Sequence, residues 1–247
     1  MKLYGLIGYP LEHSASPDLF RKMAERENLH DAEYRLFPIK EITELPRLVA
    51  ETPDLLGFNV TSPYKQTIIP YLTHIDDAAS TIEAVNTVKV VRENGRTELH
   101  GYNTDYIGMA ESMLDTLPYL PQRALVLGTG GASEAVSYAL SLLLISAETV
   151  SRTPGKGTFT YNELTENLIH ENLLVVNATP LGMYPDTAGC PDFPFELLTP
   201  YHILFDLIYN PEETEFLRQG RLHGARTYNG LDILRHQAEA SYKIWGL

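Results

Sequence analysis

A short stretch of the sequence, Asn59-Val60-Thr61-Ser62-Pro63-Tyr64-Lys65, brings an amide, a hydroxyl and an ammonium group together. Amides and hydroxyls hydrogen-bond the hydroxyl groups of a ligand, and an ammonium group can stabilise a developing negative charge or donate a proton. Further polar clusters fall at other junctions between predicted elements: Ser14 and Ser16, Asn86-Thr87, and Asn103-Thr104-Asp105. Together these clusters predict a site for a small acid that carries several hydroxyl groups.

Two of these clusters have a second interpretation that the sequence leaves open. Ser14 and Ser16 lie beside a predicted helix start, where hydroxyls and free N–H groups could hold a carboxylate, but Ser16 could equally serve only as the helix cap. Ser62-Pro63 is also typical of a helix start, which would put Lys65 near the positive end of a helix dipole. A lysine in that place is either exposed without a role or positioned for chemistry.

Short apolar segments that alternate with helical patterns are expected to position these clusters. The predicted strands are Leu3–Gly8, Leu56–Val60, Ala84–Val91 and Thr97–Gly101, and the predicted helices begin at Ser16, at Ser62-Pro63 and at about Thr104. Asn94-Gly95 predicts a two-residue turn that joins the last two of these strands into a hairpin. The polar residues therefore fall where elements meet.

A second predicted region begins with the apolar strand Arg123–Leu127, which runs directly into Gly128-Thr129-Gly130-Gly131-Ala132-Ser133. A helix is expected from this turn to about Leu144, and another strand near Thr149–Ser151. Glycines let the backbone approach a ligand closely, and the start of a helix offers unpaired N–H groups to a phosphate. This order of elements predicts a dinucleotide site; a purely structural turn is the alternative.

The residues after the second strand of this region indicate which nucleotide binds. NAD sites usually place Asp or Glu there for the ribose hydroxyls, but this sequence has Ser151-Arg152-Thr153 and then Lys156. Cations and hydroxyls suit a 2′-phosphate and favour NADP, the alternative being basic residues that are merely exposed on a loop. Later strands are expected to end at Asn177 and Asp206, and a last helix to begin at Leu231. This alternation predicts an α/β protein with a parallel sheet covered on both faces.

The composition of the 247 residues excludes several classes of protein. A net charge of −13 argues against a nucleic-acid partner, which would require a basic surface. With 44% hydrophobic residues the chain can form a core, and no apolar run is long enough to predict a membrane span. The apolar N-terminal segment is short and ends at Gly8 and Pro10, so it predicts a buried strand and not a signal peptide.

Cysteine and histidine indicate neither a disulfide nor a metal site. Cys190 is the single cysteine; it is expected to be a loop thiol and fits a reducing, cytoplasmic environment. Seven of the eight histidines are scattered without the spacing of metal ligands and are expected to be surface or locally hydrogen-bonded residues: His13, His74, His100, His170, His202, His223 and His236. We therefore expect no metal cofactor.

Taken together, these motifs resemble those of shikimate dehydrogenases over nearly the whole chain. The shared motifs are Ser14-Ala15-Ser16-Pro17, Asn59 to Lys65, Ala84-Val85-Asn86-Thr87, Gly101 to Asp105, Gly128 to Ser133, Ser151-Arg152-Thr153, Asn177-Ala178-Thr179, Asp206 to Tyr209, and Gly230-Leu231. The resemblance implies an NADP-dependent oxidoreductase that reduces 3-dehydroshikimate to shikimate, in the biosynthesis of chorismate and aromatic amino acids. It also implies an α/β fold with two domains: a substrate-binding domain over 1–106, completed by the C-terminal helix 231–247, and a Rossmann-like NADP-binding domain over 107–230.

The resemblance also assigns site residues by position. Lys65 and Asp105 are expected to form the catalytic pair. Substrate contacts are expected from Ser14, Ser16, Asn59, Thr61, Lys65, Asn86, Asp105, Tyr209 and Gln237. Contacts to NADP or NADPH are expected from Gly128, Thr129, Gly130, Gly131, Ala132, Ser133, Ser151, Arg152, Thr153, Lys156, Thr179, Leu207 and Gly230. The expected partner is the small-molecule substrate, with no nucleic acid or membrane, in a monomer or homodimer.

This sequence departs from the family pattern between Ser151 and Asn177, which lie closer together than in the family. A helix after the second strand of the NADP-binding domain is therefore expected to be missing. Two alternatives stay open. One is a quinate/shikimate dehydrogenase, against which the two serines at 14 and 16 and the lack of an acid after the second strand argue. The other is a ligand-binding module without activity, against which the presence of Lys65 and Asp105 argues.

Overall fold

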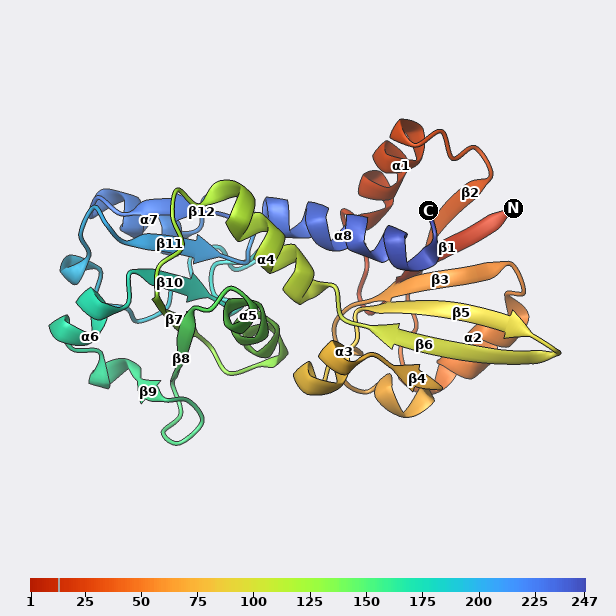
Figure 1. The fold of residues 1–247 in the computed structure, drawn as a ribbon, viewed down its shortest axis with the longest axis horizontal. Helices are drawn as coiled ribbons and strands as arrows, with labels where there is room; N and C mark the ends of the chain where they lie inside the picture. The colour runs from red at the N-terminus through yellow and green to blue at the C-terminus, as the bar shows by residue number, and fades with distance from the viewer. Residues whose placement is uncertain (13) are drawn as a thin grey trace. The chain divides into compact units, whose positions relative to one another are not determined.

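The computed structural model describes residues 1–12 and 14–247, so the prediction for His13 lies outside the described residues. The chain forms two compact units: unit 1 comprises Met1–Thr104 with Gln237–Leu247, and unit 2 comprises Asp105–His236 (Figure 1). The predicted boundary at 106/107 lies two residues after the first division, and the one at 230/231 lies six residues before the second. The second difference arises because α8 (Leu231–Trp245) is one continuous helix that contributes residues to both units.

Unit 1 contains a mixed sheet of six strands. In spatial order these are β2 (Ala32–Phe37), β1 (Lys2–Ile7), β3 (Leu55–Val60), β5 (Thr87–Glu93), β6 (Arg96–Tyr102) and β4 (His74–Ile75). β1 is parallel to β2 and β3, whereas β5 is antiparallel to β3 and β6. The predicted hairpin is confirmed, because Asn94 and Gly95 join β5 to β6 with φ values of 51° and 75°. The expected parallel pairing therefore holds for only part of this sheet.

The helices of unit 1 pack on both faces of its sheet. They are α1 (Ser16–Arg26), α2 (Leu45–Glu51), α3 (Asp77–Ile82) and the C-terminal part of α8, with 3₁₀ helices at Ile42–Glu44 and Ile69–Tyr71. Because side chains alternate along a strand, Leu3 packs in one apolar cluster with α2, and Tyr4 packs in another with α1 and α8. Gly57 lets α8 approach β3 closely, since a Cβ there would lie 2.3 Å from Trp245 Nε1.

The helix predicted at Ser62-Pro63 was wrong. The segment after β3 forms turns and then the 3₁₀ helix Ile69–Tyr71. Pro70 lacks an N–H and would clash with the preceding turn of an α-helix, so a helix from Pro63 could not continue through this point. The carbonyl of Lys65 instead accepts a hydrogen bond from the Val85 N–H at 2.8 Å. Lys65 therefore does not lie at a helix N-terminus, and the dipole argument does not apply to it.

The predicted capping role of Ser16 was also wrong, although α1 does begin at this residue. The N-cap is Ala15, which is already in the right-handed helical region with φ −79° and ψ −8°. Ser16 is therefore inside the helix, where its hydroxyl is not placed to cap the N–H groups of the first turn. Its own N–H donates to Ser14 Oγ at 3.3 Å.

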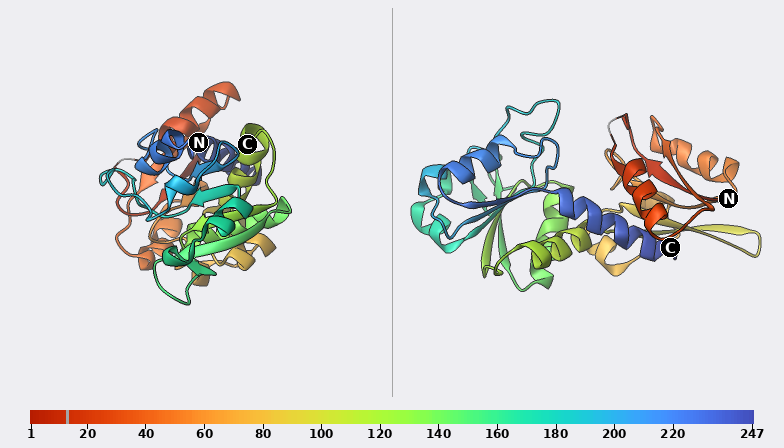
Figure 2. Two further views of the ribbon diagram at one scale, coloured as in Figure 1. Left: turned by 90° about the vertical axis from the view of Figure 1, so that its left-hand side faces the viewer. Right: turned by 90° about the horizontal axis from the view of Figure 1, so that it is seen from above.

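Unit 2 contains a parallel sheet of six strands. In spatial order these are β12 (Arg226–Tyr228), β11 (Ile203–Asp206), β10 (Leu174–Asn177), β7 (Arg123–Leu127), β8 (Ser146–Ser151) and β9 (Phe159–Thr160). The helices are α4 (Asp105–Thr116), α5 (Gly131–Leu142), α6 (Glu166–Glu171) and α7 (Glu215–Leu222), with 3₁₀ helices at Tyr161–Glu163 and Phe195–Leu197. Val126 and Leu127, neighbours on β7, belong to different apolar clusters, so the sheet is covered on both faces as predicted (Figure 2).

The connection from β8 to β9 contains no helix among residues 152–158, as the shortened sequence predicts. Parallel neighbours usually need a crossover of about a dozen residues or more. Here two reciprocal bonds hold the short loop: Thr149 N–H donates to Thr158 Oγ1 at 3.2 Å, and Thr158 N–H donates to Thr149 Oγ1 at 3.1 Å. The loop therefore stays close to β8, on the side where the glycine-rich turn ends β7.

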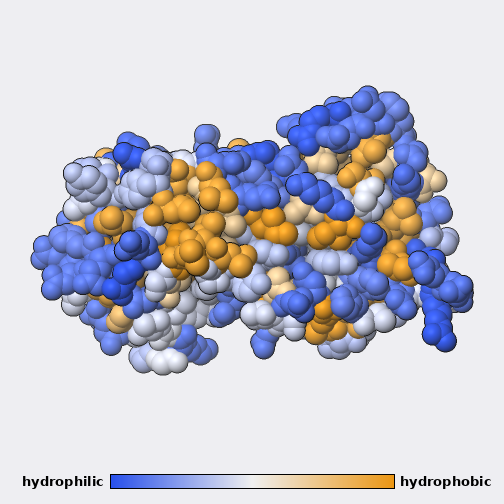
Figure 3. Space-filling view, in the orientation of Figure 1, coloured by the Kyte–Doolittle hydropathy of each residue, from blue (hydrophilic) through white to orange (hydrophobic). Residues whose placement is uncertain are grey.

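The surface of unit 2 carries apolar side chains over the region of α4 in the view of Figure 3. Leu114 on α4 is 58% exposed, and Leu120 in the following segment is 38% exposed. Apolar atoms contribute much of any protein surface, so scattered exposed leucines need no special explanation.

Candidate active site

Asn59 lies at the centre of a partly buried hydrogen-bond network in unit 1. Its Nδ2 donates to Thr87 Oγ1 at 3.1 Å and to Ser241 Oγ at 2.9 Å. Its Oδ1 accepts from the hydroxyl of Tyr34 at 2.9 Å. Because both polar atoms of the amide are bonded, the orientation of the Asn59 side chain is fixed.

Asn86 extends this network toward α8. It is only 3% exposed, and its Oδ1 accepts from the Thr104 N–H at 2.7 Å and from Thr104 Oγ1 at 3.2 Å. Its Nδ2 donates to Gln237 Oε1 at 3.3 Å. The structure thus brings the predicted substrate residues Asn86 and Gln237 into contact, although 151 positions separate them in the chain.

The sheet register and the pitch of α8 explain why these residues meet. Asn59 lies opposite Thr87 in the β3–β5 pair, and Thr87 lies opposite Tyr102 in the hairpin. Gln237 and Ser241 are one helical turn apart and share a face of α8. The Ser241 hydroxyl donates to the Gln237 carbonyl at 2.9 Å. The network therefore joins the central strands β3 and β5 to one face of the C-terminal helix.

The predicted carboxylate seat lies at the start of α1. Ser14 Oγ accepts from the Ser16 N–H at 3.3 Å. Burial raises the pKa of Tyr34 well above its ordinary range, with a smaller contribution from Tyr242. Tyr34 therefore stays a neutral phenol that donates to Asn59 Oδ1.

Lys65 and Thr61 follow β3 in unit 1. The Thr61 N–H donates to the Ile7 carbonyl at 2.9 Å, so the segment begins in register with β1. Asp105 is the first residue of α4, and Tyr209 follows β11; both are in unit 2. The structure thus describes Lys65 and Asp105 in different units, and their catalytic pairing stays a prediction.

The glycine-rich turn of unit 2 has the geometry of a phosphate cradle. Gly128 has a φ of 115°, and a Cβ there would lie 3.2 Å from the Ala178 carbonyl oxygen. Gly130 is the N-cap of the 12-residue helix α5, which has no side-chain cap bond. A Cβ on Gly130 or Gly131 would meet nothing within 4 Å, so the space before the helix is open. Ser133 is buried, and its hydroxyl donates to the Gly130 carbonyl at 2.8 Å.

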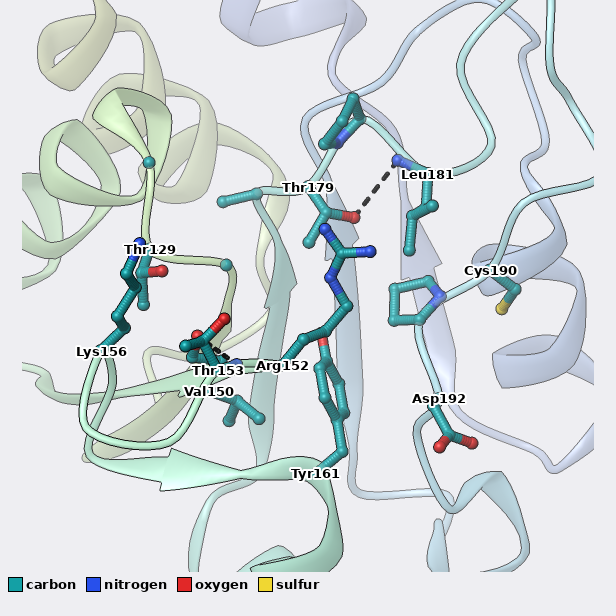
Figure 4. A pocket seen from close by; sticks show the side chains of 16 residues that line it. Thr129, Val150, Arg152, Thr153, Lys156, Tyr161, Thr179, Leu181, Cys190 and Asp192 are labelled. Carbon is teal, nitrogen blue, oxygen red and sulfur yellow. Dashed lines mark hydrogen bonds between the residues drawn. The ribbon is translucent and has the colours of Figure 1, made fainter.

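A cavity of about 590 Å³ opens at this turn. The predicted cofactor residues that line it are Gly128, Thr129, Gly130, Ser151, Arg152, Thr153, Lys156 and Thr179. Figure 4 shows Arg152 extending across the cavity from the end of β8, with Lys156 to one side and Cys190 to the other. Open space before a helix start, together with two cations on the lining, fits a ligand with several phosphates such as NADP.

The remaining predicted cofactor residues do not line this cavity: Gly131, Ala132, Ser133, Leu207 and Gly230. Leu207 and Gly230 instead form a close backbone contact. A Cβ on Gly230 would lie 2.0 Å from the Leu207 carbonyl oxygen, so only glycine fits there without displacing the backbone. The structure therefore gives Gly230 a structural requirement of its own.

Asp206 is the last residue of β11, and its carboxyl group accepts hydrogen bonds from two neighbouring segments. Its Oδ1 accepts from Asn177 Nδ2 at 3.1 Å and its Oδ2 accepts from the Thr214 hydroxyl at 2.6 Å. Asn177 Oδ1 in turn accepts from the Thr179 hydroxyl at 2.6 Å, which positions a cavity residue. Burial raises the pKa of Asp206 to about 6, although hydrogen bonds led by Thr214 oppose the rise.

Sequence reasoning missed several residues of both sites. In unit 1 they are Tyr34 and Ser241; in unit 2 they are Val150, Tyr161, Ala178, Pro180, Leu181, Cys190, Pro191 and Asp192. Burial raises the pKa of Tyr161 to about 12, with Arg152 opposing the rise, and burial raises that of Cys190 to about 11. Ser241 could have been found, because it is one turn after Gln237 on a predicted helix.

Within residues 1–12 and 14–247, no group of three or more histidine, cysteine or acidic side chains could hold a metal ion. His202 is buried and hydrogen-bonds Thr199 and the Ile169 carbonyl, and His236 contacts Glu111 and Asp115 at 3.1 Å each. Among the helices of that same part of the chain, none is long and apolar enough to cross a membrane.

A glycine-rich turn at the carboxyl edge of a parallel sheet defines unit 2 as a dinucleotide-binding domain of the Rossmann type. The family model described as the shikimate dehydrogenase substrate binding domain matches residues 6–88, within unit 1. A shikimate dehydrogenase (NADP(+)) from Methanococcus maripaludis is 38% identical over 261 aligned positions, which cover 99% of this chain and 91% of the relative. The chain belongs to the shikimate dehydrogenase family, as the motifs indicate.

Solved structures agree with this assignment. A shikimate 5-dehydrogenase from Thermus thermophilus, in complex with NADP(H) and shikimate, superimposes with a TM-score of 0.88 at 30% identity, covering 100% of this chain and 94% of that one. A quinate dehydrogenase from Corynebacterium glutamicum, in complex with NAD, gives a TM-score of 0.87 at 26% identity with the same coverage. The predicted fold class is confirmed.

Proposed function

We propose that this chain is an NADP-dependent shikimate dehydrogenase that reduces 3-dehydroshikimate to shikimate in aromatic biosynthesis. The observation that carries the proposal is the partly buried Asn59–Asn86–Gln237 network. It holds amide side chains in fixed orientations at the positions that the family resemblance assigns to a polyhydroxylated acid. Amides fixed in this way recognise hydroxyl groups because each can donate and accept.

The cofactor site supports NADPH as the reductant. Gly128, Thr129 and Gly130 leave the start of α5 open for the pyrophosphate, and Arg152 with Lys156 provides cations for the 2′-phosphate. When bound, NADPH supplies the hydride for the reaction. The protein orients the bound cofactor, and the cations at its site favour the cofactor that carries the 2′-phosphate.

The substrate residues divide by the group that each would recognise. Ser14 and Ser16 would hold the carboxylate at the start of α1. The hydroxyl groups would be held by Asn59, Thr61, Asn86, Tyr209 and Gln237. This division follows from chemistry, since a carboxylate only accepts hydrogen bonds whereas a hydroxyl group donates and accepts.

Lys65 and Asp105 would carry the proton chemistry. Reduction of a ketone places negative charge on its oxygen, and the Lys65 ammonium stabilises that charge and delivers a proton to the oxygen. The Asp105 carboxylate orients Lys65 and accepts a hydrogen bond from the substrate hydroxyl. In the oxidative direction neutral Lys65 takes the proton back.

The test is absorbance at 340 nm with shikimate and either NADP or NAD. We expect rapid reduction of NADP, much slower reduction of NAD, and a kcat about 10² to 10⁴ lower for Lys65→Ala. Lys156→Ala serves as a matched control: it removes the same charge from the cofactor loop, so KM for NADP should rise while kcat changes little. Wild-type protein without shikimate-dependent reduction of either cofactor would overturn the proposal.

A second candidate is oxidation of quinate with NAD, which the likeness to the quinate dehydrogenase favours. Ser14 and Ser16 and the cations Arg152 and Lys156 weigh against it. Parallel assays of quinate and shikimate with each cofactor separate the two enzymes. A ligand-binding module without activity would bind shikimate in calorimetry and show no NADPH binding.

The setting of the enzyme is part of the proposal. A single cysteine suits the reducing cytoplasm, and a net charge of −13 argues against nucleic-acid or anionic membrane partners. We expect a monomer or a homodimer. Light scattering coupled to gel filtration measures the mass directly, and a value corresponding to three or more copies of the 27.7 kDa chain would contradict this expectation.

A further inference from the structure

The first part of α8 contacts α4 within unit 2. Glu111 and Asp115 lie one helical turn apart on one face of α4, and both contact His236 of α8. His236 is the last residue of α8 that belongs to unit 2, and Gln237, the next residue, is the first that belongs to unit 1. A contact that fixes α8 at His236 therefore bears directly on the orientation of Gln237.

The ring of His236 is buried between these two carboxylates. The residue is only 6% exposed, its Nδ1 lies 3.1 Å from Glu111 Oε2, and its Nε2 lies 3.1 Å from Asp115 Oδ2. The two acidic side chains are about half exposed, so their outer sides stay in contact with water. Both ring nitrogens thus have a partner on α4, and the ring is held from both of its edges.

The groups around the ring determine where its hydrogens lie. The carboxylate of Glu111 can only accept, so Nδ1 carries a hydrogen whether the ring is neutral or protonated. Nε2 also lies 3.0 Å from Arg235 Nη2, which can only donate. A neutral ring therefore accepts from Arg235, whereas a protonated ring donates to Asp115. The bond to Glu111 is made in both cases, so the contact with α4 does not require a charge on the ring.

An apolar contact beside the ring brings the same two helices together. Ile233 of α8 packs against the apolar cluster that contains Met109 and Met113 of α4. Ile233 lies three residues before His236, so the two share a face of α8. Apolar packing has no preferred direction, whereas the hydrogen bonds of the ring fix the rotation of α8 about its axis. Because successive side chains on a helix differ by about 100°, this rotation determines where the side chain of Gln237 points.

We propose that His236 is a positioning residue for shikimate recognition, which fixes the rotation of α8 and thereby holds the Gln237 amide in place for a substrate hydroxyl group. Gln237 Oε1 accepts from Asn86 Nδ2 at 3.3 Å, which is longer than most such bonds, so that contact holds the amide only weakly. Without the contact at His236, substrate binding would have to order this turn of α8, which lowers affinity. The inference rests on the proposed function, because His236 acts through a residue assigned to the substrate.

The test compares His236→Leu with His170→Leu in steady-state kinetics. Leucine fills much of the space of the ring and makes neither hydrogen bond. For His236→Leu we expect KM for shikimate to rise about fivefold, kcat to stay within about twofold and KM for NADP to stay unchanged, because lost positioning bonds weaken ground-state recognition. His170 is an exposed histidine on α6 of the same unit, and its substitution should leave all three constants unchanged.

Double variants distinguish positioning from a general loss of structure. In a Gln237→Ala background, His236→Leu should raise KM for shikimate no further, because the amide that it positions is absent. A residue that only supports the fold would raise KM by the same factor with or without that amide. If His236→Leu does not fold, the double variant Glu111→Ala/Asp115→Ala changes only half-exposed side chains and should give the same rise in KM.

The outcomes of failure are separate. Wild-type protein that does not oxidise shikimate overturns the proposed function. Active wild-type protein overturns the role of His236 alone if KM for shikimate is unchanged in His236→Leu, or if the rise is equally large in the Gln237→Ala background.

Discussion

The two units hold their candidate ligand sites by different means. In unit 1 the site is a network of side chains, in which Asn59 and Asn86 are oriented by partners from β2, β5 and α8. In unit 2 the part expected to face the pyrophosphate is backbone, formed by glycines and by the open start of α5, while side chains from other segments line the rest of the cavity. Substrate recognition therefore depends on side chains far apart in the sequence, whereas the phosphate cradle of the cofactor site depends on one contiguous turn.

The difference predicts two kinds of failure. Removing a polar side chain from unit 1 leaves buried donors or acceptors without partners, which costs stability as well as affinity. Adding a Cβ in unit 2 acts by occupying space, so the result depends on what lies within reach of that atom. Variants in both units test this contrast.

Gly230→Ala should have the largest effect. The new Cβ would lie 2.0 Å from the Leu207 carbonyl oxygen and 2.5 Å from its carbon, and both are backbone atoms that cannot rotate away. We expect a loss of about 3 kcal/mol in the free energy of unfolding. Gly131→Ala is the control, because a Cβ there meets nothing within 4 Å and should leave stability unchanged or slightly raised. Chemical denaturation measures both; equal stabilities would contradict the contact argument.

Asn86→Ala should be the most damaging change in the unit 1 network. It leaves the buried Thr104 N–H and the partly buried Gln237 amide without their bonds to Asn86. The expected loss of stability is about 2 kcal/mol, together with weaker shikimate binding. Asn167→Ala, an exposed site on α6, provides the matched control and should change stability by less than about 0.5 kcal/mol. Similar losses for the two variants would refute the network.

Arg152→Gln tests whether a side chain of unit 2 contributes to the selectivity for NADP over NAD. Removing this cation from the cavity should raise KM for NADP about tenfold, since a charge-assisted bond to the 2′-phosphate is lost, and leave KM for NAD nearly unchanged. Steady-state kinetics with both cofactors provide the measurement. An equal rise for NAD and NADP would show that Arg152 contacts a part common to both.

Asp206 accepts hydrogen bonds in unit 2 much as the amides do in unit 1, but its carboxyl group can ionise. Stability should therefore depend on pH through Asp206 and not through the amide network. Its pKa is raised by burial from the ordinary 3.8 to about 6, so the folded state holds this proton between pH 4 and 6 while the unfolded state has released it. Stability from this group is therefore present at low pH and is lost as pH rises through about 6. From pH 5 to 7 the loss is about 1 kcal/mol relative to Asp206→Asn. Denaturation of the wild type and of Asp206→Asn should give stabilities that differ less at pH 5 than at pH 7. An equal difference at both pH values would contradict the raised pKa.

The same contrast explains what the sequence could predict. The turn from Gly128 to Ser133 was recognisable because its strand, glycines and helix are consecutive, and the Asn94-Gly95 hairpin is likewise local. Tyr34 was missed because its partner Asn59 is 25 residues away, and a tyrosine on a strand has no local pattern that marks it as a site residue. The helix at Ser62-Pro63 was wrong because a local start signal competes with Pro70 and with backbone bonds to distant segments.

In unit 2 as well, local features could be predicted from the sequence and features set by tertiary packing could not. The loss of a helix after β8 could be predicted from the spacing of two motifs, but the residues that line the cavity beside the short loop could not. Tyr161 and Cys190 reach it from separate segments whose course depends on tertiary packing. Asp206 was expected only as a strand end, and its contacts with Asn177 and Thr214 required the folded sheet.

The most direct test of the account is calorimetric titration of shikimate and NADPH, each separately, into Gln237→Ala and Gly130→Ala. Gln237→Ala should bind shikimate about tenfold more weakly and NADPH normally, because the Gln237 amide accepts a hydrogen bond from Asn86 of the unit 1 network. Gly130→Ala should fold normally, since its Cβ meets nothing within 4 Å, and should lose at least about tenfold in NADPH affinity while retaining shikimate binding. We expect this crossed pattern. Variants that each weaken both ligands equally, or a Gly130→Ala protein with undiminished NADPH affinity, would contradict it.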